Sequence, residues 1–585
     1  MRKTGKKARG FRMKNFAVTF YPDGKKISVP EGTSALKAAA ACGIFFHSSC
    51  GGEGICGRCR ILIRKGSVPQ SGAEGKISEK DRKKGYVLAC RASILSDAEI
   101  EIPPESRQAK EQILTEEYGN IFTTEEAIKE KDRQAAFPLS PLGVGPGDVS
   151  AGNFGIAADI GTTSVVTKLA DLSTGEILGT KAARNTQARH GDDIITRIIF
   201  AEKTEGLEEL HRLIIDNLNG LISALADEAG IKTDEIRAIV CAGNTTMLHL
   251  LLKINPAYLR RGPCTPAAAS MPLIRASETG IRINPGGLLA CLPGVSSYVG
   301  ADIVAGVLAS GIYEENNPCL LIDMGTNGEI ALGSKEWLAC CAASAGPAFE
   351  GSGVRCGVWA MEGAIQKIEI NPVNGKIKYS TIGGAKPIGI CGSGYIECIA
   401  EMLRSGIIDR SGRIKEHGIP GNAPTDIRKG TDGLEMVLVK AKESASGSDI
   451  VITQADITNL ILSKGAIYTA ASVLLKKTNL KFSEVEKIYL AGGFGSYLSI
   501  DKSICIGLLP DVPREKFRYI GNSSLAGAKL SLLSGRAMEE AGAIAKKMTY
   551  IELSTEPSFM NDYTGSLFLP HTDLDLFPTS CLLKK

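Results

Sequence analysis

Near the start of the chain, hydrophobic and polar residues alternate in a pattern that predicts a small α/β unit. Residues 16–29, FAVTFYPDGKKISV, alternate on both sides of a Pro-Asp-Gly turn, as the two strands of a hairpin do. Thr33 or Ser34 can cap a short helix over the alanine-rich stretch that follows. Residues 60–66, RILIRKG, read as a third strand, and residues 98–103, AEIEIP, as a fourth.

A longer pattern occurs twice in the rest of the chain. Residues 154–185 read as three strands joined by tight turns, and an Asp stands at the end of the first strand. Residues 317–346 repeat this plan, with the equivalent Asp 164 positions later. We therefore expect two lobes, each opened by a three-stranded meander.

A polar stretch rich in Pro and Gly separates the two patterns and predicts a domain boundary. The expected fold class is α/β. The expected segments are a basic tail (1–14), a small first domain (15–103), a linker (104–152), a first lobe (153–317), a second lobe (318–553) and a C-terminal tail (554–585).

Composition narrows the possible functions only slightly. The 585 residues are 43% hydrophobic and 23% charged, and the net charge of +4 gives no argument for nucleic-acid binding. The basic N-terminus lacks the apolar region of a signal peptide, and no stretch approaches the ~20 apolar residues of a membrane span. We expect a cytoplasmic protein without membrane contact. Its sixteen cysteines would then be reduced.

Four cysteines form a candidate metal site in the first domain. Cys50, Cys56 and Cys59 lie in the glycine-rich stretch SSCGGEGICGRCR, and Cys90 follows in YVLACRA. Three bunched ligands and one distant ligand suit a 2Fe-2S cluster, whose plant-type spacing is C-x4-C-x2-C…C. The first gap is five residues here, which resembles the adrenodoxin-type variant of this spacing. Zinc and metal-free thiols stay open as alternatives. The remaining cysteines are expected to be small buried hydrophobic residues.

The repeated Asp-x-Gly-Thr turns have the chemistry of a phosphate site. Glycine lets backbone amides approach phosphate oxygens, Thr and Asn add donors, and each Asp can hold Mg²⁺ directly or through water. An ordinary pair of turns is the alternative. The candidate residues are Asp159, Gly161, Thr162 and Thr163 in the first turn and Asp323, Gly325, Thr326 and Asn327 in the second.

Two further glycine elements are candidates for nucleotide contacts. Gly492 and Gly493 follow an apolar strand, where bare backbone can face a flat ligand such as adenosine. Gly392, Ser393 and Gly394 begin a helix whose amides can receive an anion. Helix–strand packing and simple capping are the respective alternatives.

A few polar residues are weaker candidates. Glu329 could act as a base toward a nucleophilic water, or be a solvated strand carboxylate. Asn244, Thr245 and Thr246 could cap a helix or belong to the site, and His190 could be purely structural.

These motifs carry a resemblance to a known family. The two Asp-x-Gly-Thr loops and the late Gly-Gly turn, in this order, resemble the actin, heat-shock chaperone and sugar kinase superfamily over residues of about 154–550. The whole chain resembles the reductive activators of corrinoid proteins, which join a 2Fe-2S domain to this ATPase fold. NTQARHGDDIITRI, AGNTTMLHLLL, PGVSSYVGADIVAGV, SAGPAFEGSGV and AGGFGSYLSI are similar to that family's segments.

The resemblance implies a fold and a function. The fold would be an N-terminal β-grasp ferredoxin-like domain followed by a two-lobed actin-like ATPase. The four cysteines would ligate a 2Fe-2S cluster, the two Asp residues would be catalytic, and the glycine elements would surround Mg-ATP. The activity would be ATP-dependent reduction of Co(II) to Co(I) in the corrinoid protein of a methyltransferase or O-demethylase system, with electrons from an external low-potential donor.

Two other functions remain open at this point. A small-molecule kinase with a regulatory iron–sulfur domain would use the same nucleotide fold. A nucleotide-dependent, redox-sensing binding module would use both domains without turnover. A homodimer is possible, because the apolar C-terminal stretch LFLPHTDLDLFP could pack on its own lobe or on a second subunit.

Overall fold

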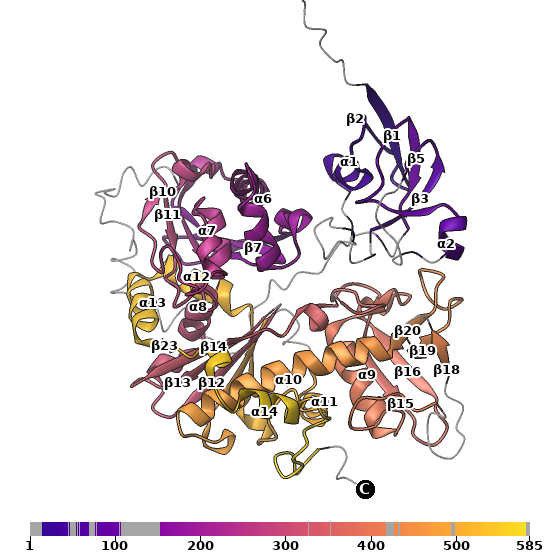
Figure 1. Ribbon diagram of the computed structural model, residues 1–585. Helices are drawn as coiled ribbons and strands as arrows, with labels where there is room; N and C mark the ends of the chain where they lie inside the picture. The colour runs from indigo at the N-terminus through magenta and orange to yellow at the C-terminus, as the bar shows by residue number, and fades with distance from the viewer. Residues whose placement is uncertain are drawn as a thin grey trace, which may run out of the picture. The chain divides into compact units, whose positions relative to one another are not determined.

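The computed structural model divides into two compact units (Figure 1). The structure describes residues 14–44, 46, 54, 57, 59–69, 77, 79–103, 106, 152–325, 327–351, 353–416, 426–430, 433–492 and 498–580.

The N-terminal unit is a five-stranded sheet covered by one short helix. Strand order is β2-β1-β5-β3-β4, with β1 antiparallel to β2 and parallel to β5. Ser34 caps α1 by accepting from Lys37 N, which decides between the two expected caps. Val18, Phe20, Ile61 and Ile100 are fully buried in its core. The elements are β1 (Asn15–Tyr21), β2 (Lys25–Pro30), α1 (Ala35–Ala41), β3 (Arg60–Lys65), α2 (Glu79–Lys83), β4 (Tyr86–Leu88) and β5 (Ala98–Glu101).

The first lobe of the larger unit contains a six-stranded sheet of order β10-β11-β9-β6-β7-β8. β6, β7 and β8 form the expected antiparallel meander, and β9 and β11 add to it in parallel. The strands are β6 (Phe154–Ile160), β7 (Ser164–Asp171), β8 (Ile177–Arg184), β9 (Ile236–Ala242), β10 (Ile274–Arg275) and β11 (Leu288–Cys291). Its helices are α6 (Gly206–Ala229), α7 (Thr245–Leu251) and α8 (Ala301–Ser310). The helix α5 (Ile194–Ala201) begins in residues 187–197, which group with the N-terminal unit, and ends in the larger unit.

The second lobe repeats this plan in a sheet of order β22-β21-β12-β13-β14-β23. β12, β13 and β14 form an antiparallel meander, and β21 and β22 again add in parallel. The internal repeat inferred from the sequence is therefore a repeat of topology. The strands are β12 (Cys319–Met324), β13 (Gly328–Gly333), β14 (Leu338–Ala343), β21 (Ile488–Ala491), β22 (Phe517–Gly521) and β23 (Met548–Tyr550).

The central strands of the second sheet are buried on both faces. Leu321 and Ala331 belong to the same core as the first lobe, whereas Leu320 and Ile322 belong to the core of the second lobe. This division follows from the alternation of side chains along a strand. α8 and α12 (Ser523–Leu533) pack against each other, and α8 also contacts β12, so these helices connect the two sheets (Figure 1).

The long helix α10 (Gln454–Lys477) packs beside β13 and β14 and begins with a capping box of Thr453 and Asp456. Its length, and a mean hydropathy of 1.2 over an 18-residue stretch, would suit a membrane span. However, 78% of that stretch is buried within the protein, as in a core helix. α9 (Gly392–Arg404), α11 (Ile500–Ile506), α13 (Gly535–Lys547) and α14 (Phe559–Ser566) complete the described α-helices.

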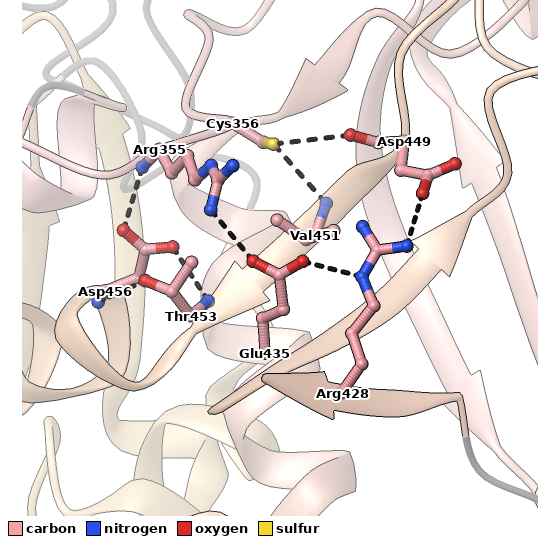
Figure 2. A network of polar contacts seen from close by, with 8 residues as sticks. All are labelled: Arg355, Cys356, Arg428, Glu435, Asp449, Val451, Thr453 and Asp456. Carbon is pink, nitrogen blue, oxygen red and sulfur yellow. Dashed lines mark hydrogen bonds and ion pairs between the residues drawn. The ribbon is translucent and has the colours of Figure 1, made fainter. Parts of the chain in front are cut away.

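Two three-stranded sheets extend the second lobe. They are formed by β15 (Ala364–Ile370), β16 (Ile377–Thr381) and β17 (Gly389–Ile390), and by β18 (Ile427–Gly430), β19 (Gly433–Val439) and β20 (Ile450–Thr453). Figure 2 shows that Glu435 of β19 lies between two arginines. The side chain of Glu435 is 3% exposed and accepts from Arg355 Nη1 and Arg428 Nε, both at 2.8 Å. The paired guanidinium groups compensate the burial of this carboxylate.

The C-terminal stretch packs on its own lobe. Leu569 and Phe577 are fully buried in the core of the second lobe. The buried Lys464 of α10 donates through Nζ to the carbonyls of Phe568 and Pro570, both at 2.6 Å. Burial lowers the pKa of Lys464 well below its usual value. The first of the two alternatives for this stretch is thus the one observed.

Most described cysteines outside the candidate cluster are buried and free, as expected. Cys42, Cys264 and Cys356 keep partial exposure. Cys505 in α11 is buried, as expected, but it is disulfide-bonded, so the expectation that it is reduced was wrong.

Candidate functional site

Two of the four candidate cluster ligands lie side by side at one end of the N-terminal sheet. Cys59 immediately precedes β3 and is buried, and Cys90 follows β4 with partial exposure. Their sulfur atoms are 3.3 Å apart, a separation that suits two thiolates on one metal centre with metal–sulfur bonds of about 2.3 Å. Cys50 and Cys56 lie outside the described residues. Gly54 and Gly57 have φ of 76° and 72°, a backbone conformation that glycine favours.

The first phosphate-loop candidate joins β6 to β7. Asp159 lies near the carboxyl end of β6, and a Cβ added to Gly161 would approach Ser164 O to 2.6 Å, so this tight turn requires glycine. Asn185 Nδ2 donates to Gly161 O at 2.9 Å, and Asn185 N donates to Thr163 O at 2.9 Å. These bonds fix the loop backbone.

Asn244 connects this loop to a neighbouring helix. Its Oδ1 accepts from Met247 N at 3.0 Å and caps α7, while its Nδ2 donates to Thr162 Oγ1 at 2.9 Å. Asn244 therefore serves both as the cap and as a contact to the loop, which were alternatives in the sequence. Thr245 donates to Ser296 O at 2.6 Å, and the buried Thr246 is within α7.

The second phosphate-loop candidate has the same place in the second lobe. Asp323 lies near the end of β12, opposite Glu329 of β13, and Gly325 N donates to Asn327 O at 3.0 Å. Gly492 follows β21 with φ of 97°, and a Cβ there would lie 2.3 Å from Met324 O and 2.9 Å from Asp323 Oδ1. Close packing on the Asp323 strand thus requires Gly492. Thr326 and Gly493 lie outside the described residues.

Four carboxylates interact where the two lobes meet: Asp159, Asp302, Asp323 and Glu329. Burial raises the pKa of Asp323 to about 7, and the charges of Asp159 and Glu350 add to this effect. Burial, together with Asp302 and Asp323, raises the pKa of Glu329 well above its usual value. Carboxylates that interact in this way are a site to which a cation would be attracted. Among the described residues, no three His, Cys, Asp or Glu side chains are close enough to ligate one metal ion directly.

Asp302 is a member of this group that the sequence analysis missed. It lies in the first turn of α8, where its Oδ1 accepts from Ile303 N at 2.9 Å. Burial, then Asp323 and Asp159, raise its pKa to about 7. The available signal was an acidic residue two positions after a glycine at a helix start, a pattern that usually indicates simple interaction with the helix dipole.

Three consecutive residues at the start of α12 were also missed. Asn522 Nδ2 donates to Asp159 Oδ2 at 3.0 Å, and Ser524 Oγ donates to Asp159 Oδ1 at 2.8 Å. Ser523 Oγ donates to Asp323 Oδ2 at 3.2 Å. Burial raises the pKa of Asp159, and the bonds from Asn522 and Ser524 oppose that rise.

The element at the start of α9 is tightly packed. Gly392, Ser393 and Gly394 are buried, and Cβ atoms on the two glycines would lie 1.8 Å from Phe349 O and 2.1 Å from Ile365 O. Packing therefore accounts for the glycines, and an anion-binding role stays a prediction. His190 ends a short 3₁₀ helix, Thr186–His190.

A cation–π contact joins the lobes beside the first loop. The guanidinium carbon of Arg184, the last residue of β8, lies 6.0 Å from the ring centroid of Trp359 in the second lobe. Asn185, the next residue, holds the Gly161 carbonyl.

Two features define the class of protein. One is a ferredoxin-like sheet with paired thiols, and the other is a duplicated α/β unit with carboxylates at equivalent strand ends. The class is an iron–sulfur domain fused to an ATPase fold of the actin-like superfamily. Three family profiles match the chain in order. They are the 2Fe-2S iron-sulfur cluster binding domain over residues 18–95, the RACo middle region over 154–315, and the C-terminal domain of RACo, the ASKHA domain, over 317–581. The chain belongs to the family of reductive activators of corrinoid proteins.

Known relatives cover nearly the whole chain. It is 32% identical over 596 aligned residues to the corrinoid activation enzyme RamQ of Eubacterium limosum, covering 92% of this chain and 96% of the relative. It is 26% identical over 452 residues to the [Co(II) methylated amine-specific corrinoid protein] reductase of Methanosarcina barkeri, covering 71% and 76%. The solved structure of a reductive activator for corrinoid,iron-sulfur protein is 41% identical with a TM-score of 0.69, covering 96% of this chain and 100% of that one.

Proposed function

We propose that this chain is an ATP-dependent reductive activator of a corrinoid protein, which transfers one electron to convert Co(II) to Co(I). The observation that carries this proposal is the presence, in one chain, of a 2Fe-2S binding domain and a duplicated nucleotide-binding fold, in the order found in a relative that acts in corrinoid activation.

The N-terminal domain provides the electron-transfer site. Cys50, Cys56, Cys59 and Cys90 are the proposed ligands, and the 3.3 Å separation of the Cys59 and Cys90 sulfurs fits shared ligation. A 2Fe-2S cluster, when bound, accepts and donates a single electron. The donor is an external low-potential one-electron reductant, because the sequence contains no recognised flavin or nicotinamide site.

The two lobes provide the nucleotide site. Asp159 and Asp323 are proposed to hold the magnesium ion of Mg-ATP, with Asp302 as a third carboxylate near it. Gly161, Thr162, Thr163, Gly325, Thr326 and Asn327 would contact the phosphates, and Gly492 and Gly493 the adenosine. The 2.9 Å bond from Asn244 to Thr162 and the bonds from Asn185 hold the first loop in place for this contact.

ATP hydrolysis is proposed to provide the energy that the electron donor lacks. Each 59 mV of unfavourable potential costs a factor of ten, or about 1.4 kcal/mol, for one electron. Nucleotide binding would favour one arrangement of the lobes, and a corrinoid protein that binds the two arrangements differently would be reduced in one of them. We infer a cytoplasmic location, where such a corrinoid partner and a low-potential donor are available.

The test uses the full chain, reconstituted anaerobically with iron and sulfide, a chemical one-electron donor and a candidate corrinoid protein. ATP should produce the Co(I) absorption spectrum, and a non-hydrolysable ATP analogue should not. Cys59→Ala should abolish Co(I) formation while ATP binding persists. Cys42→Ala is the matched control, because Cys42 is a free thiol of the same domain outside the motif. ATP-dependent phosphorylation of a metabolite without any Co(I) formation would instead identify a kinase.

A further inference from the structure

The start of α12 contacts the carboxylates of both lobes with three neighbouring side chains. Asn522 and Ser524 bind the two oxygens of Asp159, and Ser523 binds Asp323. These residues are remote in sequence from their partners, by 363 and 365 positions for the bonds to Asp159. No other described hydrogen bond joins one helix to both of these aspartates.

The geometry leaves each donor little freedom. Asn522 Oδ1 accepts from Leu525 N at 2.8 Å as the cap of α12, so its amide NH₂ must face Asp159. Ser523 and Ser524 are buried. A Cβ added to Gly306 of α8 would lie 3.0 Å from Ser523 Oγ, which shows how closely α8 packs against this hydroxyl. A buried hydroxyl with a fixed partner holds that partner in one orientation.

The three bonds do not all lie within one lobe. α12 packs against α8, β6 and β9, so it belongs with the first lobe although it follows β22 in the chain. The bonds from Asn522 and Ser524 to Asp159 therefore stay within the first lobe. The bond from Ser523 to Asp323 crosses to the second lobe.

We propose that Asn522, Ser523 and Ser524 are positioning residues for the Mg-ATP site: Asn522 and Ser524 fix the orientation of Asp159, and Ser523 sets the distance of Asp323 from it. This inference rests on the proposed nucleotide role of the two aspartates. Mg²⁺ tolerates little deviation from octahedral oxygen geometry, so the placement of the carboxylates determines its affinity. Residues that orient metal ligands typically affect metal affinity ~10- to 100-fold.

The experiment measures ATP hydrolysis by the full chain as a function of Mg²⁺ concentration, together with ATP binding. Ser524→Ala should raise the Mg²⁺ concentration for half-maximal activity ~10- to 100-fold, and Ser524→Thr, which keeps the hydroxyl, should restore it. Ser523→Ala should lower kcat more than it raises KM for ATP, because it loosens the contact between the lobes. Both effects would be absent for a residue that only filled space.

Two further variants separate positioning from folding. Asn522→Ser keeps a helix cap of similar strength and removes the amide donor to Asp159 without adding a charge, so its melting temperature should stay near wild type while its Mg²⁺ requirement rises. Ser531→Ala is the matched control, since Ser531 is a buried serine of the same helix whose Oγ has no hydrogen-bond partner among the residues that the structure describes. It should leave hydrolysis unchanged.

The outcomes distinguish this inference from the function on which it rests. If wild type hydrolyses Mg-ATP and all three variants keep its Mg²⁺ requirement and kcat, the positioning role is wrong and the nucleotide site stands. The same conclusion follows if Ser524→Thr is as impaired as Ser524→Ala. If wild type neither binds nor hydrolyses Mg-ATP, the proposed function itself is wrong.

Discussion

At the scale of single residues, we expect Asp302 to make the stability of the nucleotide-free protein depend on pH. Burial and the charges of Asp323 and Asp159 raise its pKa to about 7 in the folded protein, against about 4 for an unfolded Asp. The folded state therefore binds the proton more tightly, so this contribution to stability is present at low pH. It is lost as the pH rises toward 7.

We expect Asp302→Asn to raise the melting temperature of the nucleotide-free protein more at pH 8 than at pH 5. Asn keeps the Oδ1 acceptor for Ile303 N and removes the charge. Thermal unfolding at the two pH values measures the difference, and ATP binding at pH 8 should weaken in the same variant. An equal shift at both pH values would contradict this account.

The sequence identified the site residues that form local motifs and missed those that arrive through tertiary contacts. Asp159, Gly161 and Asp323 belong to short turn motifs in which glycine and aspartate have a recognisable spacing. Asn522 and Ser524 reach Asp159 from more than 360 residues away, and their own segment resembles an ordinary helix cap. A single sequence contains no signal that connects the two.

At the scale of secondary-structure elements, Gly492 shows how one glycine allows two strands to approach. A side chain there would clash with Met324 O and would have to adopt φ of 97°. Gly492→Ala should destabilise the larger unit by ~1 to 3 kcal/mol and weaken ATP binding. Gly542→Ala is the control, because nothing lies within 4 Å of its Cβ position and it is inside α13. That change should stabilise the helix by ~0.5 to 1 kcal/mol in urea unfolding.

The ion-pair network of β18 and β19 gives a second prediction at this scale (Figure 2). Glu435→Ala removes the buried carboxylate that Arg355 and Arg428 share. Breaking a fully buried pair costs ~3 to 5 kcal/mol. Because the two arginine side chains are 42% and 46% exposed, we expect a loss of ~1 to 3 kcal/mol. Urea unfolding measures it, and the exposed Glu443→Ala should change little.

The sequence pattern predicted the meanders but not the two small sheets of the second lobe. β6–β8 and β12–β14 have long apolar runs punctuated by turns, which local pattern recognises. β15–β20 are short strands whose pairing depends on contacts such as those of Glu435, so their arrangement is decided by tertiary packing.

At the scale of the whole molecule, the nucleotide should stabilise the larger unit only with its metal. Ligand at about 100 times its Kd adds ~2.7 kcal/mol to the free energy of unfolding. We expect ATP with Mg²⁺ to raise the melting temperature of one thermal transition, and EDTA to remove this effect. The transition of the N-terminal unit should stay in place, because the two compact units have separate cores. A shift of equal size in EDTA would argue against carboxylate-held magnesium.

The contact between Arg184 and Trp359 gives the protein its own optical probe. The chain contains two tryptophans, Trp337 and Trp359, and the ring of Trp359 lies against a cation of the first lobe. In a Trp337→Phe background all indole emission comes from that one ring. Any separation of the lobes would then change the emission wavelength and intensity of Trp359 fluorescence in real time, without a label attached to the protein.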